Sequence, residues 1–138
     1  MQLATARVLI GMVIAWNLQA ALAFILSPGA YAPGFELSGI PGTAAVQGTA
    51  LLFIMWNIPY LVACWHPRRH IVSLVEALVM QTIGLIGESA LLLSIPVEHA
   101  SLRASITRFI IFDATSLLAL AIALGLARAS QKAHQART

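Results

Sequence analysis

Two apolar stretches decide the fold: IVSLVEALVMQTIGLIGESALLLSI at residues 71–95 and LRASITRFIIFDATSLLALAIALGLA at residues 102–127. Each is long enough to cross about 30 Å of hydrocarbon as a helix, because a helix rises about 1.5 Å per residue. Glu88 lies within the first stretch and Arg108 within the second. A charge at a bilayer centre costs roughly 2.5–3.5 kcal/mol on insertion scales, so both residues are candidates for a specific role.

The composition excludes several classes of protein. Of the 138 residues, 59% are hydrophobic and only 9% are charged, against about 25% charged in an ordinary soluble domain. The net charge of +3 does not indicate nucleic-acid binding, because the basic residues flank apolar runs and form no patch with interleaved aromatics. The single cysteine, Cys64, excludes an internal disulfide.

Four apolar runs, at residues 8–26, 44–65, 71–95 and 102–127, predict four membrane-spanning helices. The short turns near residues 66–70 and 96–101 make successive helices antiparallel. We therefore expect an all-α, integral membrane four-helix bundle with up-down topology, formed by residues 1–138 as one transmembrane domain. Residues 27–43 contain Pro28, Pro33 and Pro41 and cannot form one continuous helix.

The basic residues predict the orientation in the plasma (inner) membrane. Lysine and arginine are enriched in cytoplasmic segments, and six of them fall on the side that holds both termini against one on the other side. We therefore expect both termini in the cytoplasm and the Pro/Gly-rich loop outside. The six are Arg7, Arg68, Arg69, Arg128, Lys132 and Arg137, and the one is Arg103.

Because the Pro/Gly-rich loop carries apolar side chains that water does not favour, we expect it to form an ordered cap over the outer end of the bundle. These side chains are Tyr31, Phe35, Leu37 and Ile40.

Polar residues inside the apolar runs should face the interior of the bundle. Gln81 and Glu88 are two helical turns apart and share a face with Gly84. Glu88 and Arg108 both lie roughly 10 Å below the outer surface, which predicts an ion pair between neighbouring helices. Arg108 and Asp113 point about 140° apart, so Asp113 should address other partners. Asn17, Asn57 and Gln81 are the candidate donors to Asp113.

Two tryptophans, Trp16 and Trp56, lie too deep for an interfacial belt. We interpret them as core residues that donate their indole N–H groups, or alternatively as the wall of an aromatic ligand pocket. His66 and His70 share one turn that offers too few ligands for a metal site. We therefore expect no metal and no resident cofactor.

The four runs, the SPG…PG connection after the first of them and the basic HPRR turn after the second resemble DoxX-like small membrane proteins. That resemblance covers the architecture of most of the chain. It implies a four-helix membrane fold and, from some members, a link to quinone-coupled redox complexes. The resemblance includes no motif that matches Glu88, Arg108 or Asp113.

These features leave several functions open. The first is binding, either of a lipid or quinone-like amphiphile within the bundle or of membrane-complex subunits, for which the chain would be an accessory subunit. A homo-oligomer is a further partner class. One alternative is a membrane enzyme that uses Glu88 or Asp113 as acid or base, and another is a proton or small-ion conduit. The polar residues are equally compatible with a purely structural brace between helices. The candidate ligand-binding residues are Glu88, Arg108, Asp113, Gln81, Asn57, Asn17, Trp16 and Trp56.

Overall fold

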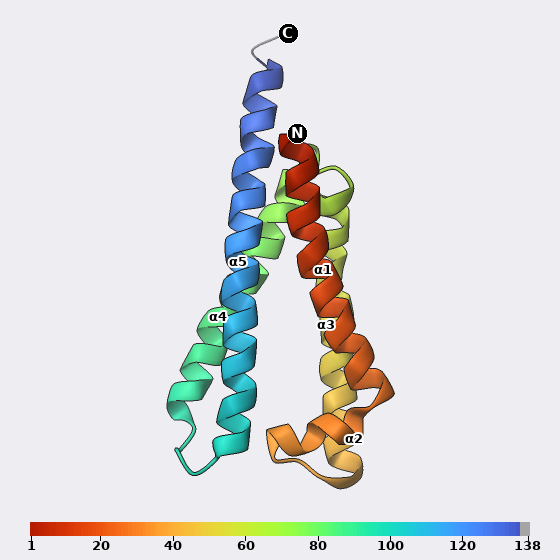
Figure 1. Cartoon of the computed structure of the whole chain (residues 1–138), viewed down its shortest axis with the longest axis vertical. Coiled ribbons are helices and arrows are strands. Elements are labelled where there is room, and N and C mark those ends of the chain that lie inside the picture. Colours follow the sequence, from red (N-terminus) through yellow and green to blue (C-terminus); the bar gives the residue numbers. More distant parts are fainter. Residues whose placement is uncertain (136–138) are drawn as a thin grey trace.

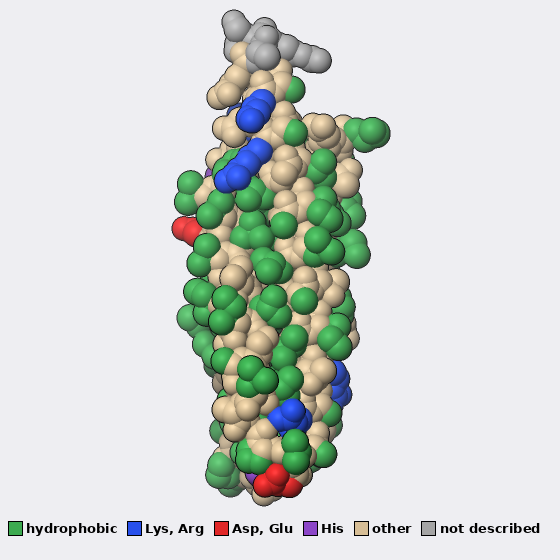
Figure 2. Space-filling view, turned by 90° about the vertical axis from the view of Figure 1, so that its left-hand side faces the viewer, with side chains coloured by type: hydrophobic (Ala, Val, Ile, Leu, Met, Phe, Trp, Pro, Cys, Tyr) green, Lys and Arg blue, Asp and Glu red, His purple; other side chains and the backbone are tan. Residues whose placement is uncertain are grey.

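The computed structural model describes residues 1–135. Their elements are α1 (Gln2–Leu26), α2 (Pro28–Tyr31), the 3-10 helix η1 (Ala32–Phe35), α3 (Gly39–Trp65), α4 (Ile71–Ser94) and α5 (Ala100–Gln135). The four long helices α1, α3, α4 and α5 are each long and apolar enough to cross a membrane. Hydrophobic side chains run along the face in Figure 2, and most of the charged ones there lie near its two ends. The chain is therefore a small multi-pass membrane protein with four candidate spans.

The long helices pack antiparallel in a bundle (Figure 1). Within the described residues, α1 packs against α3 and α5, and α4 packs against the same two helices. The start of α1 and the end of α5 lie at one end of the molecule, which we call the terminal end. The opposite end carries α2, η1 and the α4–α5 turn, and we call it the cap end. The predicted all-α four-helix membrane bundle is thus confirmed.

Three helices extend beyond the apolar runs that predict them. Helix α1 begins at Gln2 and α3 at Gly39, while α5 continues to Gln135. Pro41 is tolerated in α3 because the first N–H groups of a helix have no partner within it. The polar end of α5 remains helical because Ala, Gln, Lys and Arg are good helix formers. Arg137, one of the six basic residues on which the predicted orientation rests, lies outside the described residues.

The core has two apolar parts separated by a polar layer. Toward the terminal end, Ala63, Ala77 and Ala123 are fully buried among larger residues such as Ile10 and Leu120. These small side chains let the helices approach closely. Toward the cap end the core is aromatic, with Phe24 at its centre and Phe35, Phe53 and Phe109 around it. Between them lie buried polar residues: Asn17, Asn57, Gln81, Asp113 and Ser116.

The segment formed by α2 and η1, which we call the cap, folds across the cap end. Phe35 stacks on Phe109 with ring centroids 6.0 Å apart, and Ser105 Oγ donates a hydrogen bond to the Gly34 carbonyl at 2.6 Å. A Cβ on Gly34 would lie only 3.0 Å from that Oγ, so glycine allows this close approach. Ile40, one of the apolar residues expected to hold the segment, is instead 84% exposed.

Candidate functional site

A chain of hydrogen bonds crosses the centre of the bundle. The Tyr60 hydroxyl donates to Gln81 Oε1 at 2.8 Å, and Gln81 Nε2 donates to Asp113 Oδ1 at 2.6 Å. The three residues come from α3, α4 and α5, and all are buried. Because unpaired polar groups are costly in a low-dielectric interior, this chain fixes the relative rotation of the three helices. Of the three donors that the sequence offered to Asp113, Gln81 provides the hydrogen bond.

Gly84 brings α4 close to α5 beside this chain. A Cβ at position 84 would clash with Asp113 Oδ2 and lie 3.5 Å from Cγ. Only a residue without a side chain leaves room for the carboxyl group while it is held by Gln81. The face predicted for Gln81, Gly84 and Glu88 therefore meets the interior.

A small enclosed cavity lies next to these groups. Its volume is about 20 Å³, enough for roughly one water molecule. Glu88 lines it, and one of its carboxyl oxygens, Oε2, is buried and has no hydrogen-bond partner among the residues that the structure describes. In the same described part of the chain, Asn57 Oδ1 and Ser116 Oγ are also buried without hydrogen-bond partners, while Asn57 Nδ2 donates to the Phe53 carbonyl of its own helix. The other residues around the cavity are Asn17, Phe53, Trp56, Tyr60, Met80, Gln81, Phe109, Phe112 and Asp113.

The predicted ion pair between Glu88 and Arg108 is not formed. Arg108 instead donates from Nε to the Ala104 carbonyl at 3.3 Å and from Nη2 to Ser105 Oγ at 3.4 Å. The reason is the angular separation on α5. Asp113 faces α4, so Arg108, about 140° away, faces the side of α1 instead. Matched depth alone was not enough to bring the two charges together.

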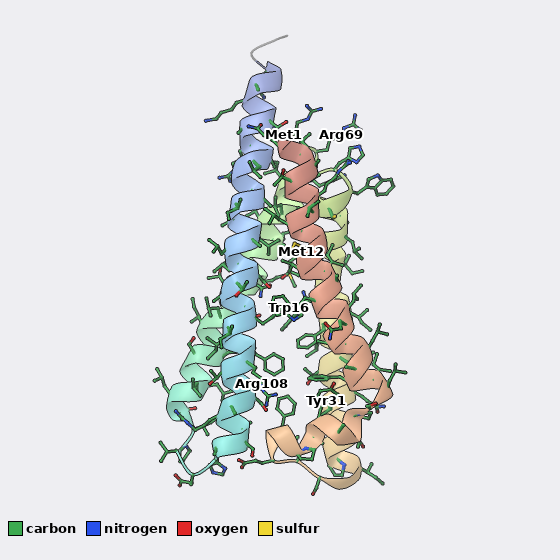
Figure 3. The ribbon with its side chains drawn as sticks, viewed as in Figure 1. Met1, Met12, Trp16, Tyr31, Arg69 and Arg108 are labelled. Carbon is green, nitrogen blue, oxygen red and sulfur yellow. The ribbon has the colours of Figure 1, made fainter. Side chains whose placement is uncertain are left out.

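Arg108 lines a groove between α1 and α5, which we call the lateral groove. It has two parts of about 370 and 510 Å³ that share Trp16, Ala20, Arg108 and Phe109. Figure 3 shows Trp16, Tyr31 and Arg108 along the space between α1 and α5, on the cap side of the bundle centre. The first part adds Asn17, Phe53, Ile111 and Phe112, and the second adds Gln19, Ala23, Phe24, Ala30, Tyr31, Gly34, Phe35 and Ser105.

The two deep tryptophans do not fill the core. Trp16 is 48% exposed and Trp56 is 42% exposed, and neither indole forms a hydrogen bond within the described part of the chain. Trp16 packs edge-on against Phe112, with ring centroids 4.8 Å apart, and lines the lateral groove. The core interpretation is therefore wrong.

Sequence reasoning missed Tyr60 and Ser116. Tyr60 lies three residues after Asn57 and Ser116 three residues after Asp113, so each shares a helix face with a residue already singled out. That spacing was the available signal. Phe109 was also missed, because an aromatic residue in an apolar run carries no signal of its own.

Glu36, the residue directly after the cap, is joined to His99 in the α4–α5 turn by an exposed ion pair. His99 Nδ1 and Glu36 Oε2 are 2.5 Å apart. The hydrogen bond with His99 lowers the pKa of Glu36, and the same bond, the charge of Glu36 and that of Glu98 raise the pKa of His99. The pair is complete between the ordinary pKa values of the two groups. It is lost as pH falls through the lowered pKa of Glu36 or rises through the raised pKa of His99.

Comparison of the chain with protein-family models, with curated proteins and with solved structures finds no match. The resemblance to DoxX-like proteins is therefore limited to the four long apolar helices, and no family model supports it. Any function has to be argued from the geometry of the bundle itself.

Proposed function

We propose that the protein binds a membrane amphiphile in the lateral groove between α1 and α5. The observation that carries the proposal is the uneven lining of this groove. Toward the bundle centre its walls are mostly apolar, with Phe53, Ile111 and Phe112. Toward the cap they include Gln19 and Ser105, beside the shared Arg108. A molecule with an apolar chain and a polar head matches this arrangement.

The size of the groove supports the same conclusion. Each part falls within the range of about 300–1,000 Å³ that is usual for small-molecule sites. A second groove of about 630 Å³ lies between α3 and α4, but its walls are mainly aliphatic, with Val62, Val72 and Val79. Its polar lining residues are Ser73 and Glu76, so it suits the chains of bulk lipid and offers no positive charge to an anionic head. The α3–α4 groove is therefore an internal comparison for the lateral groove.

The geometry favours binding over the enzyme and conduit alternatives. Glu88 and Asp113 line the enclosed cavity and do not line the lateral groove, so a molecule in the groove is not in contact with either carboxyl group. General acid–base catalysis needs such a group within hydrogen-bond reach of the substrate. The cavity itself has room for about one water and so offers no extended wet path.

Filling the groove should abolish amphiphile binding. Ala20 lines both parts, so Ala20→Phe places a ring where the ligand lies. We expect native mass spectrometry with added palmitic acid to show one retained molecule on the wild type and a loss of at least about tenfold in the variant. Ala15→Phe is the matched control, because Ala15 is exposed on the same helix and lies outside both parts. Equal retention by the two variants would rule out the groove.

We further propose that the terminal end faces the cytoplasm. Arg7, Arg68 and Arg69 belong to that end, as do the basic residues of the last turns of α5. Arg103, near the cap end, donates to the Leu92 and Ile95 carbonyls and so has a local role in closing α4. With cysteines introduced at the exposed Ser38, just beyond the cap, and at Ser130, an impermeant thiol reagent should label only position 38 from outside. Labelling of position 130 from outside would contradict this orientation.

A further inference from the structure

We propose that the lateral groove selects amphiphiles whose headgroup is an oxyanion, a carboxylate or a phosphate monoester, and that Arg108 binds this headgroup. The inference rests on the proposed function and names the ligand class for the same groove. It follows from the hydrogen bonds of Arg108, from the charge of the groove lining and from the position of Arg108 along α5.

The guanidinium group of Arg108 has unused hydrogen-bond donors. A guanidinium carries five N–H donors, and within residues 1–135 Arg108 uses only two of its nitrogens, in bonds of 3.3 and 3.4 Å to Ala104 and Ser105. Within residues 1–135 no carboxylate lies within ion-pair distance of it, and the side chain is exposed on the groove wall. The remaining N–H donors are therefore available to an acceptor from another molecule.

The rest of the lining complements a negative charge. Among the residues that line the two parts, Arg108 alone is charged. Gln19, Tyr31 and Trp16 bring N–H or O–H donors to the same groove. An anionic headgroup would meet donors and one positive charge there, and it would meet no carboxylate from the protein.

The position of Arg108 makes a partner of opposite charge favourable. It lies eight residues into α5, roughly 12 Å from the start of the helix, in a segment that is otherwise apolar enough to span the membrane. A guanidinium in such surroundings is stabilised by a bound anion, and its planar fork holds a carboxylate or phosphate with two parallel hydrogen bonds. The aromatic walls beside it would take the attached chain, which favours a lipid-borne anion over a free one.

The experiment compares amphiphiles that share one chain and differ in the head. Dissociation constants of palmitic acid, hexadecyl phosphate and hexadecanol are measured by native mass spectrometry for the wild type, Arg108→Gln, Arg108→Lys and Arg128→Gln. The last is the control, an exposed arginine on the same helix at the terminal end. We expect the wild type and Arg128→Gln to prefer the two anionic amphiphiles by about tenfold or more.

Arg108→Gln should lose that preference and still bind hexadecanol as the wild type does, which also shows that it is folded. Arg108→Lys should keep part of the preference, because it retains the charge without the fork. Equal affinity of the wild type for all three amphiphiles, or an undiminished preference in Arg108→Gln, would overturn the inference while leaving the groove as a binding site. Displacement of palmitic acid by inorganic phosphate alone would assign Arg108 to a free anion. If Ala20→Phe leaves the binding of all three unchanged, the proposed function itself fails.

Discussion

Gln81→Leu should lower the free energy of unfolding by about 2–5 kcal/mol, measured by thermal or denaturant unfolding in detergent. Gln81 joins Tyr60 to Asp113, so its loss leaves Asp113 without this donor and leaves the Tyr60 hydroxyl with only the longer contact to the Ala77 carbonyl, at 3.4 Å. A buried polar group stranded in this way costs about 1–3 kcal/mol, and more if it is charged. Leucine supplies apolar volume but no hydrogen bond, which isolates the polar contribution.

Thr82→Val is the matched control for this substitution. Thr82 is the next residue of α4, and its hydroxyl donates only to the Leu78 carbonyl of the same helix, at 2.8 Å. Its removal should change stability by less than about 1 kcal/mol. Tyr60→Phe removes the hydrogen bond from Tyr60 to Gln81 but leaves that from Gln81 to Asp113, so its loss of stability should lie between those of Gln81→Leu and Thr82→Val. A Gln81→Leu protein as stable as Thr82→Val would mean that the hydrogen bonds of Tyr60, Gln81 and Asp113 do not hold the three helices together.

Gly84→Ala should destabilise the protein by about 1–3 kcal/mol, although alanine normally favours helix. The added methyl group would occupy the position of Asp113 Oδ2. The carboxyl group can move away only by giving up its bond to Gln81 or by pushing α5 outward. Both responses weaken the contact between α4 and α5.

Gly87→Ala provides the comparison within the same helix. A Cβ at Gly87 meets nothing within 4 Å, so alanine there should be neutral or stabilising by about 0.5–1 kcal/mol. A double-mutant cycle tests the cause, because Gly84→Ala should cost much less in an Asp113→Ala background. Equal stability of the Gly84→Ala and Gly87→Ala proteins would show that Asp113 does not restrict position 84.

Much of this fold could be predicted from the sequence because a membrane allows few solutions. A span needs about 20 apolar residues, so the four helices follow from run lengths, and the turns make them antiparallel. Helical periodicity also correctly placed Gln81 and Gly84 on the face that meets α5. The prolines and glycines in residues 27–43 indicated that no continuous helix forms there. They did not predict the two short helices of the cap.

What the sequence could not supply was the rotation of each helix about its axis. Glu88 and Arg108 have similar depths, yet Arg108 faces α1 because Asp113 occupies the side toward α4. The sequence does not show whether Arg108 or Asp113 faces α4, because this depends on which helix packs against each side of α5. The exposure of Trp16 could not be predicted either, because Trp16 lines the lateral groove and the sequence does not show which side of α1 faces this groove.

Photolabelling tests the central claim, occupancy of the lateral groove, most directly. Palmitic acid with a diazirine in its chain is incorporated into proteoliposomes of the wild-type protein, and the crosslinked residues are mapped by mass spectrometry of peptides. We expect labels concentrated on the groove residues of α1 and α5, above all Trp16, Ala20 and Phe109, and competition by unlabelled palmitic acid. Labels concentrated on Val62, Val72 and Val79 of the α3–α4 groove, or spread evenly over all four helices, would contradict it.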